Sequence, residues 1–215
     1  MVSDLPSALL SATLFAYWSG VIVKSLVNRW RHGRSAGIWP KDRIERLVWP
    51  FWTPVIGLWI VLPWLALFCG QRWLGLANPT LGESGLFAPR LVAALLGFIC
   101  FVATVACWQH MGKSWSMAVV PKERTELVQT GLYAVVRHPI YALSIALMLC
   151  SLVVIPWWPM LAVAAIHCCF MAIKARNEER FLLGVHGESY AGYCRRTGRF
   201  FPRLRATNGP SSLWK

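Results

Sequence analysis

The sequence predicts an all-α, polytopic integral membrane protein with about five transmembrane helices, and three observations support this class. Hydrophobic residues make up 56% of the 215-residue chain, charged residues make up only 14%, and the mean hydropathy is +0.48. The apolar residues gather in separate runs, most of them long enough to cross about 30 Å of hydrocarbon. The chain also holds 13 tryptophans, and tryptophan is enriched where a membrane meets water.

Three apolar runs occupy the N-terminal half, at residues 7–27, 48–69 and 91–110. The first run holds Lys24 one turn before its end, where the long side chain can reach the membrane surface. Because no basic region precedes this run, we expect a retained first span and not a cleaved signal peptide.

The last two apolar runs, residues 140–155 and 160–173, are predicted to form a helical hairpin. The sequence Pro-Trp-Trp-Pro separates them and must interrupt the helix. Pro139 suits the first turn of the first of these helices, where a missing N–H is no loss. The helical pattern of the second continues to Leu183, and a short amphipathic helix is expected at residues 188–196.

The chain therefore divides into three regions. Residues 1–110 form an N-terminal region with three spans. Residues 111–202 form a core with a polar loop, the hairpin and the amphipathic helix, and residues 203–215 form a basic tail.

The charge is strongly positive, with 22 basic residues against nine acidic ones and a net charge of +13. The basic residues lie between apolar runs, so we expect a bilayer with anionic headgroups as the partner and no nucleic acid. Nineteen of them lie in the first loop, the third loop and the segment from Lys174 onward, and the other two loops hold only Arg72 and Arg90. This asymmetry predicts an N-terminus outside and a C-terminus in the cytoplasm.

The seven cysteines form no C-x-x-C pair, and most of them lie within apolar runs. Neither a zinc site nor a disulfide framework is expected, and no metal ligands are predicted. We interpret these residues as small apolar packing groups.

Two polar clusters flank the predicted hairpin. The first is the stretch 131–141, Gly-Leu-Tyr-Ala-Val-Val-Arg-His-Pro-Ile-Tyr, and the second contains Lys174, Arg176, Glu178 and Glu179. Counted from the hairpin tip at Trp157, both clusters reach nearly the same depth at about 1.5 Å per residue. The two clusters are therefore predicted to meet and form a site.

On the second predicted helix of the hairpin, the residues of the second cluster point in different directions. Lys174 and Glu178 are four residues apart and share a face, whereas Glu179 and Arg176 point elsewhere. We therefore expect one glutamate in the site and the other pairing outside it. The alternative interpretation is that both clusters are charged anchors at the headgroup level, in a membrane protein without enzymatic activity.

Together with the Gly-Glu-Ser-Tyr-Ala-Gly-Tyr sequence at residues 187–193, these two clusters resemble the isoprenylcysteine carboxyl methyltransferase family. That family belongs to a wider group of integral-membrane methyltransferases that includes phospholipid N-methyltransferases. The resemblance covers residues 111–202. It implies an S-adenosylmethionine site in the last two spans and the loops beside them.

The resemblance also implies roles for individual residues. Positions matching cofactor-binding positions of the family are Thr125, Glu126, Leu127, Val128, Tyr133, His138, Ile140, Tyr141 and Glu178. Arg137, Glu178 and Glu179 are the candidate catalytic residues. Lys174 stands where relatives that act on prenylcysteine have an arginine that orients the substrate, and Arg176 is a nearby substitute. Lysine keeps the charge but loses the two-pronged guanidinium.

The acceptor implied by the resemblance is lipid-like or hydrophobic. A carboxylate acceptor, as in prenylcysteine-type O-methylation, needs no strong base, because it is ionised at pH 7. A phospholipid amine would need a base, for which Glu178 or Glu179 is the candidate. An NADPH-dependent reductase of the sterol or steroid type is a further alternative, although Ile140 replaces the asparagine usual in those proteins. The oligomeric state is not predicted.

Overall fold

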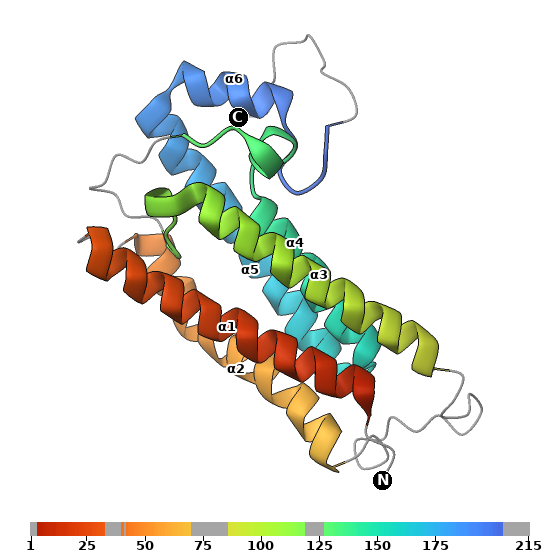
Figure 1. Cartoon of the computed structure of the whole chain (residues 1–215). Helices are drawn as coiled ribbons and strands as arrows, with labels where there is room; N and C mark the ends of the chain where they lie inside the picture. Colours follow the sequence, from red (N-terminus) through yellow and green to blue (C-terminus); the bar gives the residue numbers. More distant parts are fainter. Residues whose placement is uncertain (1–3, 33–39, 41, 70–85, 119–126, 204–215) are drawn as a thin grey trace.

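A computed structural model describes residues 4–32, 40, 42–69, 86–118 and 127–203 of the chain (Figure 1). These residues form a bundle of long helices, and no β-strand is present among them. The helices are α1 (Leu5–His32), α2 (Arg43–Cys69), α3 (Phe87–Met111), α4 (Pro139–Val154), α5 (Trp158–His186) and α6 (Glu188–Arg196), with short 3-10 helices η1 (Gly112–Ser114) and η2 (Gly131–Ala134).

Four of these helices are long and apolar enough to cross a membrane, judged by length and composition. They cover Leu5–Arg31, Arg43–Cys69, Phe87–Ser114 and Trp158–His186. Helix α4 is apolar but has only 16 residues. The prediction of an all-α polytopic membrane protein is confirmed, and the fifth apolar run forms the continuous helix that was expected.

The helices extend beyond the predicted apolar runs at their polar ends. Helix α1 continues to His32, and α2 begins at Arg43, several residues before the apolar run starts. Asp42 explains the early start of α2, because its carboxylate accepts hydrogen bonds from the backbone N–H groups of Ile44 and Glu45 at 2.9 and 3.2 Å. Such a cap satisfies donors that have no partner within the helix.

Packing in the bundle follows a simple order. Helix α1 contacts α2 and α3, α3 contacts α4, and both α2 and α4 contact α5. Residues 155–157 join α4 to α5. The core between the helices contains fully buried side chains such as Leu14, Trp59 and Met148, while many apolar side chains on the outer faces are exposed, as expected of a bundle surrounded by lipid.

The side chain of Arg90, in α3, connects three helices at one end of the bundle. Its Nη2 atom lies 2.7 Å from a carboxylate oxygen of Asp4, just before α1, and 3.0 Å from the hydroxyl of Ser7. Its Nε atom donates to the carbonyl of Val154, at the end of α4, at 2.8 Å. Arg90 is 8% exposed, so this ion pair is largely removed from water.

The opposite end of the bundle carries the polar elements. Figure 1 places α6 and the segment containing η2 at this end, near the start of α4. Asn28 of α1 donates to the carbonyl of Trp115 at 2.9 Å, and Asn177 of α5 donates to Asp42 at 3.0 Å. These side-chain bonds connect the ends of α1, α2 and α5 around the region where the two polar clusters lie.

Candidate active site

The segment before α4 has a defined backbone. Gly131 begins η2 with a φ of +63°, a conformation that favours glycine, and a side chain there would contact the ring of His110. The carbonyl of Tyr133 accepts a hydrogen bond from the hydroxyl of Tyr193 on α6 at 2.6 Å. Helix α6 therefore helps to hold the first polar cluster in place.

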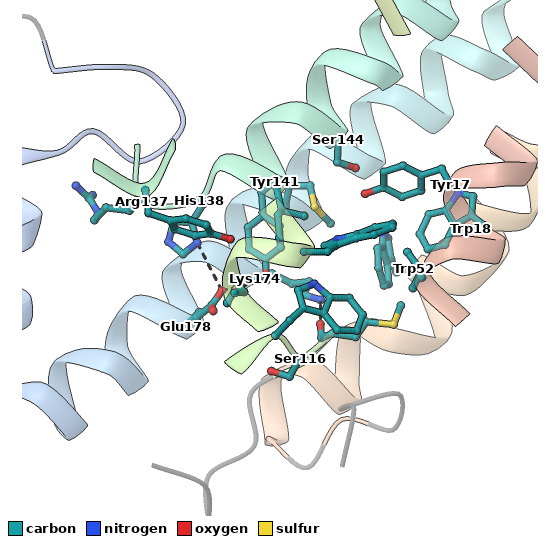
Figure 2. A pocket seen from close by; sticks show the side chains of 18 residues that line it. Tyr17, Trp18, Trp52, Ser116, Arg137, His138, Tyr141, Ser144, Lys174 and Glu178 are labelled. Atoms are coloured by element: carbon teal, nitrogen blue, oxygen red, sulfur yellow. Dashed lines mark hydrogen bonds and ion pairs between the residues drawn. The ribbon is translucent and has the colours of Figure 1, made fainter. Parts of the chain in front are cut away.

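A cavity lies beside this segment, enclosed by α1 to α5 and the residues after η1. It contains about 720 Å³ of empty space, counting the part that is open to solvent. Figure 2 shows Arg137, His138 and Glu178 toward one end and Tyr17 and Trp18 toward the other. We call these the polar end and the aromatic end.

At the polar end, two residues of the 131–141 stretch lie close to the same carboxylate oxygen. The hydroxyl of Tyr141 donates to Oε2 of Glu178 at 3.0 Å, and Nδ1 of His138 lies 3.5 Å from the same oxygen. The imidazole of His138 also stacks on the ring of Tyr141, with 5.3 Å between ring centres and 3° between planes. The predicted meeting of the two clusters is therefore confirmed.

Glu179 lies outside the cavity and is 1% exposed. Its Oε1 atom accepts a hydrogen bond from Nε of Arg137 at 3.1 Å and lies 3.3 Å from Nε2 of His138. Arg199 contacts the same carboxylate through two nitrogens, at 3.0 and 2.5 Å. The expectation that one glutamate lies in the site and the other pairs outside it is confirmed, with Glu178 in the cavity.

The two glutamates favour the protonated form of His138. Burial disfavours the charged imidazole, but the carboxylates of Glu178 and Glu179 favour it more strongly. The pKa of His138 is therefore raised above its ordinary value. A protonated ring can face both carboxylates at once, since each ring nitrogen then carries a proton.

Lys174 stands between the polar and the aromatic end. Its Nζ atom donates to the carbonyl of Met117 at 2.6 Å and lies 4.9 Å from the ring centre of Trp52 and 5.7 Å from that of Tyr141. The residue is 5% exposed. A buried cation thus faces the cavity one helical turn before Glu178, as the spacing predicted.

The aromatic end is built by the N-terminal helices. Edge-to-face pairs fix its walls, with 6.1 Å between the ring centres of Trp18 and Trp52 and 6.0 Å between those of Trp108 and Trp115. The indole N–H groups of Trp18, Trp52 and Trp108 are buried without a hydrogen-bond partner among the described residues. This end is apolar but carries donors that no acceptor in the described part of the chain satisfies.

Most of the predicted site residues border the cavity. These are Tyr133, Arg137, His138, Ile140, Tyr141, Lys174 and Glu178. Arg137 borders it with its guanidinium turned toward Glu179 and toward the backbone carbonyls of Cys194 and Thr197. Leu127, Val128, Glu179 and the exposed Arg176 do not line the cavity, and Thr125 and Glu126 lie outside the described residues.

The contribution of the first two helices to the cavity was not predicted from the sequence. Tyr17 and Trp18 lie in the middle of the first apolar run, where an aromatic belt residue is not expected, and this position was a usable signal. Arg199 was also missed, because it lies in a tail that resembled a solvated basic segment. Its partner Glu179 could be found only from the three-dimensional arrangement.

A multi-helix membrane bundle with a charged, aromatic-walled cavity defines the class of this protein. The sequence profile of the isoprenylcysteine carboxyl methyltransferase (ICMT) family matches residues 92–184, which include α4, nearly all of α5 and the polar end of the cavity. The chain belongs to this family, as the motif in residues 131–141 and the glutamate pair also indicate.

Two bacterial relatives are similar over a longer part of the chain. The cobalt-zinc-cadmium resistance protein CzcN of Cupriavidus metallidurans is 30% identical over 171 residues, which cover 73% of this chain and 68% of that protein. The nickel-cobalt-cadmium resistance protein NccN of Alcaligenes xylosoxydans xylosoxydans is 28% identical over 154 residues, covering 69% of this chain and 65% of that protein. The chain thus spans about two thirds of each relative's length.

Proposed function

We propose that this protein transfers a methyl group from S-adenosylmethionine to a hydrophobic acceptor at the cytoplasmic face of a membrane, and that the acceptor group is a carboxylate. The observation that carries the proposal is the cavity itself. Its polar end holds His138, Tyr141 and Glu178 from the family motif, while its other end is apolar and aromatic. A charged cofactor and an apolar acceptor can thus meet in one space.

The residues of the polar end fit S-adenosylmethionine, which carries an ammonium, a carboxylate and a sulfonium that donates the methyl group. The side chain of Glu178 is 33% exposed toward the cavity, so its carboxylate can take the ammonium or a ribose hydroxyl. Both ring nitrogens of His138 face the glutamates, so its imidazole, whose pKa is raised, can orient Glu178 and add positive charge near the carboxylate of the cofactor. The rings of Tyr133 and Tyr141 can attract the sulfonium by cation–π interaction of about 0.5–2 kcal/mol.

Arg137 has a different role in this proposal. Its guanidinium already contacts Glu179 and two backbone carbonyls, so we assign it to holding the motif in place, with no direct cofactor contact. Glu179 is likewise assigned to the support of His138, since it is buried behind the cavity.

The aromatic end favours a carboxylate acceptor over an amine. A cationic amine would be repelled by the ammonium of Lys174, whereas a carboxylate would be attracted to it. The indole N–H groups of Trp18 and Trp52 have no acceptor within the ranges that the structure describes. They suit oxygen atoms, because an indole N–H can only donate. A carboxylate is ionised at neutral pH, so the chain's residues need only position it and exclude water.

Calorimetry on the detergent-purified protein tests the proposal, with S-adenosylmethionine and NADPH titrated side by side. We expect micromolar binding of S-adenosylmethionine that is lost in Glu178→Ala and His138→Ala. It should be kept in Glu188→Gln, because Glu188 is exposed and pairs with Arg195. Binding of NADPH alone would replace the proposal with a reductase, and binding of neither would favour a non-enzymatic membrane protein.

Methyl transfer is then measured with labelled S-adenosylmethionine in liposomes. A prenylcysteine analogue should be labelled as an ester that alkali cleaves. Alkali-stable label in the phospholipid amine would instead identify an N-methyltransferase and overturn the carboxylate assignment.

The names of the two relatives suggest a biological setting for the same activity. Both are named for resistance to metal ions, and we infer that methyl transfer by this chain contributes to such resistance. The described residues contain no group of three or more His, Cys, Asp or Glu side chains that could hold a metal ion. Growth of a host on cobalt, zinc and cadmium should improve with the wild type and not with Glu178→Ala; equal growth would refute the inference.

A further inference from the structure

The segment after α6 pairs with the backbone of the 131–141 stretch. The N–H of Arg137 donates to the carbonyl of Gly198 at 2.8 Å, and the N–H of His138 donates to the carbonyl of Arg199 at 3.1 Å. Val136 and Gly198 form a parallel β-bridge. The backbone that carries His138 into the site is therefore fixed by residues that lie about sixty positions later in the chain.

The side chain of Arg199 reaches from this segment to Glu179. Its Nε and Nη2 atoms contact the two carboxylate oxygens at 3.0 and 2.5 Å. This two-pronged arrangement fixes the plane of the carboxylate as well as its position. Arg137 contacts only Oε1 of Glu179, at 3.1 Å, so Arg199 supplies the contact that prevents the carboxylate from rotating.

Glu179 in turn lies against His138. Its Oε1 atom is 3.3 Å from Nε2 of the imidazole, while Nδ1 is turned to Glu178 in the cavity. The ring of Phe200, next to Arg199 in the chain, lies 6.2 Å from the imidazole ring. The orientation of His138 thus depends on a carboxylate whose own orientation depends on Arg199.

We propose that Arg199 is a positioning residue of the active site, which acts through Glu179 to orient His138 toward Glu178 and the bound cofactor. The catalytic consequence rests on the proposed methyl-transfer function. The orientation of the imidazole by Arg199 does not depend on that function, and it can be measured without any cofactor.

The chain offers matched variants for the test. Arg199→Ala removes the guanidinium that contacts Glu179. Arg199→Lys keeps the charge but loses the two-pronged contact. Arg203→Ala is the control, because Arg203 lies in the same segment and donates to the carbonyls of Cys194 and Arg195 without touching Glu179. All variants are first compared for folding by circular dichroism in detergent.

The first measurement is the imidazole N–H signal of His138 by NMR in protein labelled at histidine, assigned with His138→Ala. A buried ring held against a carboxylate should give an N–H proton that exchanges slowly with water. We expect this protection to fall at least tenfold in Arg199→Ala, to be partly restored in Arg199→Lys and to be unchanged in Arg203→Ala. Equal protection in Arg199→Ala and Arg203→Ala would overturn the proposal.

The second measurement links Arg199 to the cofactor through a double-mutant cycle. Arg199→Ala should raise the Kd for S-adenosylmethionine about tenfold in the wild-type background and less than twofold in the His138→Ala background. An equal effect in both backgrounds would show that Arg199 acts on general structure and not through His138. If the wild type binds no S-adenosylmethionine, the proposed function fails, and the NMR result alone decides the positioning role.

Discussion

The hydroxyl of Tyr141 and the imidazole of His138 converge on one oxygen atom, Oε2 of Glu178, at 3.0 and 3.5 Å. One of these residues lies just before α4, another in its first turn and the third near the end of α5. The contact therefore closes the site across two helices, and it orients a carboxylate that would otherwise rotate in the cavity.

Tyr141→Phe should weaken S-adenosylmethionine binding by about tenfold. The change keeps the ring and its stacking with His138 but removes a hydrogen bond to a carboxylate, which contributes on the order of 1.5 kcal/mol. Calorimetry measures the Kd, with Glu188→Gln as the control. An affinity equal to that of the wild type would show that Glu178 needs no support from the hydroxyl.

The protonated state of His138 should stabilise the fold at low pH. Burial lowers the pKa of His138, but Glu178 and Glu179 raise it by more than burial lowers it. The pKa in the folded protein therefore lies above the unfolded value of about 6.5. A raised pKa contributes stability that is fully present below pH 6.5 and is lost as pH rises through the folded pKa. Denaturant unfolding in detergent between pH 5.5 and 9 should show this loss in the wild type and not in His138→Gln; identical profiles would contradict the prediction.

Lys174→Met should impair use of a carboxylate acceptor while leaving the cofactor bound. The variant fills a similar volume but removes the cation beside Trp52 and Tyr141. We expect the KM for a prenylcysteine analogue to rise about tenfold and the Kd for S-adenosylmethionine to change less than twofold. Lys174→Arg is the matched control and should stay close to the wild type. A cofactor affinity that falls together with the acceptor affinity would place Lys174 in the cofactor site.

Arg90→Ala should destabilise the bundle by about 3 kcal/mol. The side chains of Arg90 and Asp4 are only 10% and 20% exposed. The change removes the cation that faces this largely buried carboxylate, together with the hydrogen bond from Nε of Arg90 to the carbonyl of Val154. Glu188→Gln breaks an exposed pair with Arg195, whose side chains are 81% and 50% exposed, and should change stability by less than about 1 kcal/mol. Unfolding midpoints in a denaturing detergent titration compare the two, and equal midpoints would refute the prediction.

The helices could be predicted from the sequence because apolar runs separated by basic loops reflect the thickness of a membrane. The contact between His138 and Glu178 could be predicted as well, since the rise per residue places both at one depth. The ends of the helices could not be predicted, because polar residues outside an apolar run can continue the helix, as the residues after Asp42 do. The placement of the basic loops on the cytoplasmic side of the membrane remains a prediction.

The pairing of side chains at the aromatic end of the cavity could not be predicted from the sequence, for a physical reason. Trp18 and Trp52 are separated by a loop and belong to different helices, and their contact depends on how α1 and α2 pack. Apolar residues on neighbouring membrane helices carry little pattern that specifies their partners. The pairing of Arg199 with Glu179 had the same limit, since nothing in a short basic tail indicates which acidic residue it meets.

The β-bridge between Val136 and Gly198 also has a consequence for the order in which the protein matures. A ribosome completes His138 and the two following helices, α4 and α5, before it reaches Gly198, so the motif leaves the ribosome without the backbone partner that fixes it. The polar end of the cavity therefore takes its final shape only after α5 has entered the bilayer and α6 has emerged. During synthesis, a nascent chain that lacks residues 198 and 199 carries every residue of the motif but not yet a finished site.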